Sequence, residues 1–337
     1  MNGAHYSSPE LFNDEIKTIF PGWICVGTTN ELPSNGSKVF ELYKRKTILV
    51  IRKDNSFEAF YNSCRHRGAQ LRDIEDLFSN SSKIICPYHS WCYDLDGKLV
   101  NAPRCEDTPK LFLKKLRCTI VHNLIWVSEK EPEPLQLGRD APDLLAEYNF
   151  KEYVSVYETT IEIQANWKLL VSNFNCYYHL AKVHPWLHKR SKIDNHHHIS
   201  TDSPNSIVFK TDPITEGEPF YFDQMGGSGR KDVGLFFVFF PNVFIFAMRD
   251  HAFIVTLIPQ SESKTIEKAQ LLVHPSKADN KQYWNSLLNY YTTTNNEDID
   301  ICLKTQKGVS NFYPGGTYIE PFESAVKKFD TLYLSKL

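Results

Sequence analysis

Two short motifs, each pairing a cysteine with a histidine, constrain this chain more than any other feature of its sequence. The first reads Cys64-Arg-His66 and the second reads Cys86-Pro-Tyr-His89. Residues of these types can hold a [2Fe–2S] cluster, with both thiolates on one iron and both imidazoles on the other. A Cys2His2 zinc site draws on the same ligand types, but its halves usually read Cys-x-x-Cys and His-x-n-His. The mixed pairing therefore favours the cluster over zinc.

The residues around the two motifs, Cys64-Arg-His-Arg-Gly and Cys86-Pro-Tyr-His-Ser-Trp, closely resemble the cluster loops of Rieske-type proteins. This resemblance implies that Cys64, His66, Cys86 and His89 bind a Rieske [2Fe–2S] cluster. Two neutral imidazoles in place of anionic thiolates raise the reduction potential of such a cluster, so it accepts electrons easily and passes them on.

Length and composition are typical of a globular chain with two domains. The chain has 337 residues, of which 42% are hydrophobic, and a formal net charge of -2. No basic block, acidic tail or secretory signal stands out, so we expect no binding to nucleic acid and no membrane association. The eight cysteines are spread too widely for a disulfide framework, and we expect a cytoplasmic, reducing location.

The hydrophobic pattern predicts an α+β fold, with antiparallel strands and helices in separate runs. Leu11, Ile16, Ile19 and Phe20 indicate a short amphipathic helix that stops before Pro21. Strand patterns follow, with turns predicted at Asp54-Asn55 and Asp96-Gly97, and the predicted strands are 39–46, 47–53, 57–62 and 124–129. The pattern predicts a mainly antiparallel first region.

A charged, proline-rich segment at 129–138 predicts a boundary between domains. We therefore expect a first domain of residues 1–130, with the N-terminal helix and the cluster motifs, and a second domain of residues 131–337. The second domain opens with a predicted strand and then a helix that starts near Asn166-Trp167. Three further helices are predicted at 282–293, 298–307 and 320–334.

A second candidate metal site lies in the segment 166–185, where His179 and His184 are five positions apart. On an undistorted helix this spacing turns the two side chains about 140° apart. The two histidines can therefore bind one ion only if the helix breaks between them, and Pro185 indicates a helix end close by.

The same segment carries a second resemblance. Asn166-Trp-Lys, Asn173 and Tyr178-His179-x4-His184-Pro resemble the mononuclear iron segment of the Rieske non-haem iron oxygenases, also known as the ring-hydroxylating oxygenase alpha-subunit family. The sequence is most similar to the subgroup that acts on choline, glycine betaine and carnitine. The resemblance implies an antiparallel-β Rieske domain and a helix-grip-like antiparallel sheet whose helices carry the iron.

A site with two histidines and one carboxylate leaves three positions open for oxygen and substrate, so an acidic ligand is needed downstream. In Glu297-Asp298-Ile-Asp300, the position that matches the family's third ligand is Asp298. A simpler interpretation is that acidic residues in a first helical turn offset the macrodipole. We assign that simpler role to Glu297 and Asp300, and the role of iron ligand to Asp298.

Cys176 departs from the family pattern. The resemblance implies a carboxylate at this position, three residues before His179, that links the metal sites of adjacent subunits. A thiol is a weak donor and a poor acceptor. We still place Asn173 and Cys176 in the catalytic site, because on a helix Cys176 would lie about 60° from His179.

Ser172 also replaces the glutamate that usually precedes the asparagine of this motif. Three interpretations of Cys176 stay open. Electrons could take another route, through water or Asn175; the cysteine could be redox-sensitive or engineered; or the protein could be a poorly active relative.

The resemblance implies the terminal oxygenase of a monooxygenase system that uses O2 to hydroxylate or N-demethylate a small, quaternary ammonium substrate. Electrons from NAD(P)H would reach the cluster through a separate flavin and iron–sulfur reductase, and then Fe(II) at His179, His184 and Asp298. The chain has no Gly-x-Gly-x-x-Gly fingerprint after a strand, so the reductase is expected to be another protein. The resemblance also implies a homotrimer.

Two alternatives stay open. The first is an aromatic or secondary-metabolite hydroxylase or demethylase with the same iron chemistry. The second is a Rieske electron carrier whose iron site is silent.

Overall fold

The computed structural model describes residues 1–74, 76–79, 82–130, 134–138, 140–146, 148–189, 196–199, 205–211 and 234–337. The chain divides into two compact units. The cluster-loop unit is Pro21–Glu133 and contains both Cys–His motifs. The sheet–helix unit combines Met1–Phe20 with Pro134–Leu337.

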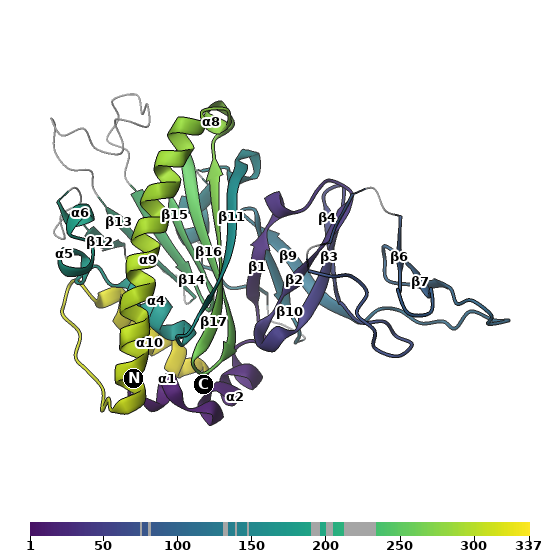
Figure 1. The fold of residues 1–337 in the computed structure, drawn as a ribbon, viewed down its shortest axis with the longest axis horizontal. Coiled ribbons are helices and arrows are strands. Elements are labelled where there is room, and N and C mark those ends of the chain that lie inside the picture. Colours follow the sequence, from purple (N-terminus) through teal and green to yellow (C-terminus); the bar gives the residue numbers. More distant parts are fainter. Residues whose placement is uncertain are drawn as a thin grey trace. The chain divides into compact units, whose positions relative to one another are not determined.

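The cluster-loop unit is built from antiparallel strands (Figure 1). Within the described residues, one sheet has seven strands in the order β1-β10-β9-β4-β3-β2-β5, and a second has three in the order β6-β7-β8. The strand bounds are β1 Ile24–Thr28, β2 Gly36–Glu41, β3 Thr47–Lys53, β4 Ser56–Tyr61, β5 Leu77–Ser79, β6 Lys83–Ile85, β7 Cys92–Asp94, β8 Leu99–Asn101, β9 Lys115–Val121 and β10 Leu124–Ser128. Two 3-10 helices are η1 Thr29–Glu31 and η2 Tyr43–Arg45.

The turns of this unit follow the predicted chemistry. Asp54 between β3 and β4 has φ 50°, and Gly97 between β7 and β8 has φ 79°. Both values lie in the left-handed region, which Asp and Gly tolerate better than most residues. The apolar core includes Leu49, Phe60 and Tyr93 and extends to the cysteines of both motifs. The core of the sheet therefore supports the cluster loops directly.

The sheet–helix unit contains a second antiparallel sheet, with the strand order β11-β17-β16-β15-β14-β13-β12 in the described residues. Its strands are β11 Val154–Ile163, β12 His196–Ile199, β13 Ser206–Thr211, β14 Gly234–Phe239, β15 Val243–Ala247, β16 His251–Ser261 and β17 Lys264–Val273. Its helices are α1 Ala4–Ser7, α2 Pro9–Thr18, α3 Asp140–Ala146, η3 Phe150–Glu152, α4 Trp167–Asn175, α5 Leu180–Val183, α6 Pro185–His188, α8 Pro275–Ala278, α9 Lys281–Asn311 and α10 Ser324–Lys336. No helix among the described residues is long and apolar enough to cross a membrane.

The long helix α9 runs along the sheet, beside α4 (Figure 1). The prediction of two helices, 282–293 and 298–307, is wrong, because α9 is one continuous helix of 31 residues. Neither proline nor glycine interrupts it before Gly308. Buried side chains along its length, including Tyr291 and Cys302, keep one face against the rest of the unit. Packing of this face therefore stabilises the helix where its sequence is polar.

The N-terminal helix belongs to the sheet–helix unit, so the predicted domain of residues 1–130 is wrong at its start. The reason is Glu15 on α2, which is fully buried. Its carboxylate accepts hydrogen bonds from Lys168 Nζ at 2.5 Å, Trp167 Nε1 at 2.8 Å and Tyr333 OH at 2.7 Å. A buried charge needs such partners, and those of Glu15 lie on α4 and α10.

The same contacts explain the Asn-Trp-Lys motif in structural terms. Asn166 caps α4, because its side chain accepts from the N–H of Lys168 at 3.0 Å. The side-chain amide of Asn166 also donates to the carbonyl of Glu262 at 2.7 Å. This motif fixes the start of α4, which leads directly to the histidine pair.

Candidate metal centres

Each Cys–His loop of the cluster-loop unit is closed by its own backbone. The N–H of Cys64 donates to the carbonyl of Ala69, and the N–H of Cys86 donates to the carbonyl of Trp91, both at 2.8 Å. The carbonyls of the two cysteines accept from Gly68 and Ser90 at 2.9 and 3.1 Å. The two loops therefore share one hydrogen-bond pattern, although their sequences differ.

In both loops the residue four positions after the cysteine has a positive φ, 75° for Gly68 and 57° for Ser90. Glycine adopts this conformation freely, whereas serine does so at a cost. The cysteine side chains are buried, with residue exposures of 3% for Cys64 and 1% for Cys86. The loops therefore direct both thiols inward.

The two histidines of the motifs converge at the surface. The Nδ1 atoms of His66 and His89 are 3.2 Å apart. The ring of His66 stacks on Trp91 with 4.7 Å between centroids. This arrangement points the same nitrogen of each imidazole at one position, as two histidines on one iron require.

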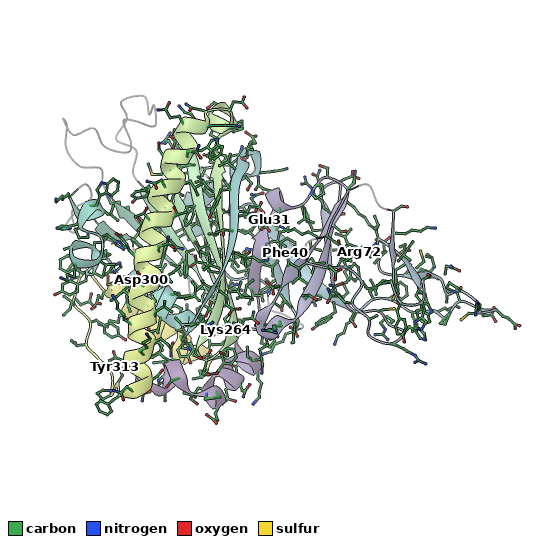
Figure 2. The ribbon with its side chains drawn as sticks, in the orientation of Figure 1. Glu31, Phe40, Arg72, Lys264, Asp300 and Tyr313 are labelled. Atoms are coloured by element: carbon green, nitrogen blue, oxygen red, sulfur yellow. The ribbon has the colours of Figure 1, made fainter. Side chains whose placement is uncertain are left out.

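Further side chains hold these loops. The hydroxyl of Tyr93 lies 3.2 Å from Sγ of Cys64 and accepts from the N–H of Arg65 at 3.1 Å. Arg72, labelled in Figure 2, donates from Nη1 to the carbonyl of Ile85 at 3.0 Å. Ile85 directly precedes Cys86. The side chain of Arg72 thus links the segment after the first motif to the residue before the second motif.

The donor positions bear on the choice between zinc and a cluster. Among the described residues, the one group of three or more His, Cys, Asp or Glu ligand atoms within 4.8 Å of one another is His179, His184 and Asp298. No three of the four cluster-motif residues form such a group. A tetrahedral zinc site would bring all four donors within about 4 Å of each other. The separate pair of thiols and pair of imidazoles therefore fit a [2Fe–2S] cluster better than a single zinc ion.

The second candidate centre lies in the sheet–helix unit, where the chain breaks its helix at both histidines. Helix α5 contains only Leu180–Val183, and His179 caps its start. His184 ends it with φ −119° and ψ 65°, and Pro185 begins α6. The Nε2 atoms of His179 and His184 therefore lie 3.3 Å apart. The expected break between the two histidines is wrong in its place: the residues between them form α5, and the helix instead begins at His179 and ends at His184.

Asp298 on α9 completes this group. Its Oδ1 lies 2.8 Å from Nε2 of His184 and 3.3 Å from Nε2 of His179. Ligand bonds of about 2.1 Å at right angles place donor atoms about 3.0 Å apart. The three separations therefore fit one face of an octahedral ion. Burial disfavours the charged carboxylate of Asp298, but hydrogen bonds from the two imidazoles lower its pKa to about 2.

Glu297 has a role that the sequence did not predict. Its Oε2 lies 2.6 Å from Nδ1 of His184, so the imidazole donates to the carboxylate there. That hydrogen bond orients the ring of His184, whose Nε2 faces Asp298. The macrodipole interpretation of Glu297 and Asp300 is wrong, because both lie in the middle of α9. Asp300 is exposed on the same helix (Figure 2).

A cavity of about 150 Å³ lies at this centre. Its wall includes His179, His184, Asp298 and the predicted site residues Asn173 and Cys176. Aromatic rings form much of the remainder, and they are Phe174, Tyr177, Phe209, Phe236, Phe244, Phe246, Phe253, Tyr290 and Tyr291. The phenylalanine-rich strands β14 and β15 therefore supply part of the cavity wall.

Glu267 is a second carboxylate in the cavity wall that sequence analysis missed. It lies on β17 and is 3% exposed. Burial raises its pKa to about 7, although a hydrogen bond from Asn295 opposes the shift. The available signal was the alternation of Glu267 with Thr265, Ala269 and Leu271 in the sequence, which is typical of one face of a strand.

Cys176 does not share a helix with His179, so the predicted angle of 60° between them is wrong. Helix α4 ends at Asn175, and Cys176 is extended, with φ −96° and ψ 130°. The thiol contacts Oε1 of Glu323 at 3.6 Å, and burial raises its pKa to about 12. The buried Nδ1 of His179 has no hydrogen-bond partner in the described part of the chain.

Sequence profiles of two known families match this chain. The profile described as "Ring hydroxylating alpha subunit (catalytic domain)" matches residues 150–337, which is more than half of the chain. The profile described as "Rieske [2Fe-2S] domain" matches residues 22–117. These two ranges contain the candidate iron group and the two Cys–His loops, respectively.

Similar proteins include the glycine betaine monooxygenase oxygenase subunit of Chromohalobacter salexigens. It is 26% identical over 97% of this chain and 83% of its own length. The carnitine monooxygenase oxygenase subunit of Escherichia coli (strain K12) is 30% identical over 57% of this chain and 54% of its own length.

Solved structures share the fold. The quaternary ammonium Rieske monooxygenase CntA, in complex with gamma-butyrobetaine, superposes with a TM-score of 0.84 at 21% identity, covering 100% of this chain and 94% of the other. Naphthalene 1,2-dioxygenase from Rhodococcus sp. gives a TM-score of 0.80 at 18% identity, covering 99% and 93%. The chain belongs to the ring-hydroxylating oxygenase alpha-subunit family, the Rieske non-haem iron oxygenases, and is an oxidoreductase whose cofactors are a [2Fe–2S] cluster and a mononuclear iron.

Proposed function

We propose that this protein is the terminal oxygenase component of a Rieske monooxygenase and that it oxidises a C–H bond of a small quaternary ammonium substrate. The observation that carries the proposal is the gathering of Nε2 of His179, Nε2 of His184 and Oδ1 of Asp298 at an aromatic-lined cavity. Similarity to subunits named for glycine betaine and carnitine supports the substrate class.

In this proposal Cys64, His66, Cys86 and His89 hold the cluster, and the triad of His179, His184 and Asp298 holds the iron. When bound, the cluster supplies electrons one at a time and the iron supplies oxygen activation. The silent-site alternative loses support, because the three donors are already at ligand spacing.

The side chains around the triad prepare it for a metal. The Glu297 carboxylate accepts from Nδ1 of His184 and orients that ring. Asp298 is ionised at neutral pH, because its pKa is about 2. Metal binding requires a deprotonated carboxylate and a neutral imidazole. The cavity beside the triad would exclude water around a bound substrate.

The aromatic wall supports a cationic substrate, since ring faces attract ammonium groups. The rings of Phe253 and Tyr291 stack with centroids 4.6 Å apart, and those of Phe209 and Phe236 do the same. An aromatic substrate is the alternative, because the same rings can stack on a planar molecule. Turnover assays with betaines against aromatic acids separate these two substrate classes.

A separate flavin and iron–sulfur reductase, fed by NAD(P)H, is part of the proposal. It rests on the absence of a Gly-x-Gly-x-x-Gly fingerprint after a strand in the sequence. A homotrimer is also proposed, and the report of inter-subunit electron transfer in a quaternary ammonium Rieske monooxygenase supports an oligomer. The cytoplasmic location stays a prediction.

We infer that Cys176 is a neutral side chain that takes no part in orienting His179. Its thiol has a pKa of about 12, which makes the reactive thiolate scarce at neutral pH and weakens the redox-sensor interpretation. Substitution Cys176→Asp places a carboxylate beside the backbone of His179, whose Nδ1 has no hydrogen-bond partner in the described part of the chain. Substrate-coupled O2 uptake should then rise, and an unchanged or lower rate would mean that Cys176 does not limit electron transfer.

The main test compares the iron content of three variants. We expect about three irons per chain in the native protein, two in the cluster and one at the triad. Asp298→Ala should lose about one iron and all substrate-coupled O2 uptake, while keeping the Rieske electron paramagnetic resonance signal. Cys86→Ala should lose that signal. Asp300→Asn, which alters an exposed carboxylate of the same helix, is the control.

Native protein with about two irons per chain, or an Asp298→Ala variant with full O2 uptake, would overturn the proposed function. Retention of the Rieske signal in Cys86→Ala would remove the cluster assignment alone.

A further inference from the structure

Glu267 is the one carboxylate in the cavity wall apart from Asp298, among the residues that the structure describes. It lies on β17 between Thr265 and Ala269, which are buried on the same side of the strand. Its Oε1 accepts from the side-chain amide of Asn295 at 2.6 Å. The carboxylate is therefore held in place by a neutral partner on α9.

The described part of the cavity wall contains neither lysine nor arginine. Its basic side chains are His179 and His184, and the Nε2 atoms of both face Asp298. Glu267 therefore has no cation beside it in this wall. A ligand cation would favour the ionised form of this carboxylate, whose pKa burial raises to about 7.

The contact with Asn295 on α9 holds this carboxylate between Tyr291 and the triad. Tyr291, Asn295 and Asp298 are spaced by four and three residues, so they lie on one face of α9. Because Glu267 is bound to Asn295, a cation beside it lies one helical turn from the triad and one turn from the ring of Tyr291. The cavity of about 150 Å³ has room for a ligand of about the size of benzene.

We propose that Glu267 is the counter-charge for the nitrogen of the substrate, and that the cavity selects a small organic cation without an acid group over a betaine. This inference rests on the proposed function and deepens it. A betaine carries its own carboxylate within a few bonds of the nitrogen. In this cavity that group would meet the charge of Glu267, and no lysine or arginine among the described residues of the wall.

The proposal also places the nitrogen, and the carbons attached to it, closest to the triad. Glu267 acts here as a binding residue that sets specificity. A neutral ligand of the same shape should gain the aromatic contacts without the charge contact. The charge of the ligand, more than its shape, should therefore decide its affinity.

The first experiment uses the native holoenzyme under anaerobic conditions and isothermal titration calorimetry. The ligands are choline, its neutral carbon isostere 3,3-dimethylbutan-1-ol, and glycine betaine. Choline should bind at least about tenfold more tightly than either of the others, because it alone combines the cation with the absence of an acid group. Equal or tighter binding of glycine betaine would overturn the inference.

The second experiment uses Glu267→Gln, which keeps the shape and removes the charge. Choline should bind about tenfold to a hundredfold more weakly, because a buried cation loses its counter-charge. The affinity for the isostere should stay within about twofold. The control is Glu162→Gln, a carboxylate with 52% of its side chain exposed on β11. Unchanged choline affinity in Glu267→Gln, with the iron content retained, would overturn the inference.

The two experiments distinguish this inference from the proposed function. If glycine betaine binds tightly and supports O2 uptake in both native protein and Glu267→Gln, the proposed function survives and the inference fails. If none of these ligands binds while the protein holds about two irons, both fail.

Discussion

The two candidate metal sites of this protein are built in opposite ways. The cluster loops are local structures, and each is closed by backbone hydrogen bonds within a few residues of its cysteine. The triad is assembled over a long range, since Asp298 lies on α9 and its partners flank α5. Short motifs can specify a local loop completely, whereas a long-range site depends on how helices pack.

The supporting charges differ in the same way. In the cluster-loop unit, Glu129 accepts from Tyr43 at 2.6 Å, Tyr61 at 2.7 Å and Lys46 at 3.1 Å, and none of these residues belongs to a Cys–His motif. In the sheet–helix unit, Glu15 anchors α4, which precedes the histidines, and Glu297 contacts His184 directly. Carboxylates thus act on the triad itself but stabilise only the scaffold of the cluster loops.

The largest effect is expected from the substitution Glu15→Ala. It leaves the ammonium of Lys168 buried without its partner, and we expect a loss of about 3–5 kcal/mol in the free energy of unfolding. Chemical denaturation followed by far-ultraviolet circular dichroism measures the change. The visible spectrum of the folded variant should keep the cluster bands, because the cluster loops do not depend on this pair.

A double variant, Glu15→Leu with Lys168→Met, is the matched control. Replacing a buried ion pair with apolar side chains of similar size should recover most of the lost stability. Native-like stability of Glu15→Ala alone would show that the buried pair does not anchor α2 and α4.

A smaller effect is expected from Glu297→Gln. The amide can still accept from Nδ1 of His184, but without the negative charge that raises the basicity of the ring. Metal affinity or activity at the triad should fall about tenfold to a hundredfold. Competition with an iron chelator measures the affinity, and the cluster spectrum should not change.

Asp300→Asn on the same helix is the control, because its carboxylate is exposed. If both variants lose iron equally, the loss comes from removing a negative charge from α9. The contact between Glu297 and His184 would then have no special role.

The smallest effect is expected from Glu129→Gln in the cluster-loop unit. Burial acts to raise the pKa of Glu129, but hydrogen bonds from Tyr43, Tyr61 and Lys46 bring it below its usual value. A lowered folded pKa stabilises the fold above the unfolded value of about 4.3, and this contribution is lost as pH falls through the folded pKa. At pH 7 the substitution should cost about 1 kcal/mol.

Denaturation of both proteins at several pH values measures this dependence. The difference between native protein and Glu129→Gln should shrink below about pH 4. The control is Glu106→Gln, which alters an exposed carboxylate of the same unit. A difference that stays constant from pH 7 to pH 3 would contradict the charged role of Glu129.

Several features could be predicted from sequence because short-range chemistry decides them. The strands β3 and β4, the turn at Asp54 and the helix break before Pro185 all follow from local patterns. The selection of Asp298 from its acidic neighbours came from resemblance, and the structure brings its carboxylate together with His179 and His184. The roles of Glu297 and Glu267 could not be predicted, because each depends on a contact with a distant segment.

By itself, the sequence determined the ligand types, the order of the two sites and the antiparallel character of both units. Tertiary structure decided the rest: that residues 1–20 pack in the sheet–helix unit, that α9 is unbroken, and that Cys176 lies outside a helix. The physical reason is the same in each case. Burial of Glu15 and of one face of α9 depends on partners far away in the chain, and no local pattern specifies those partners.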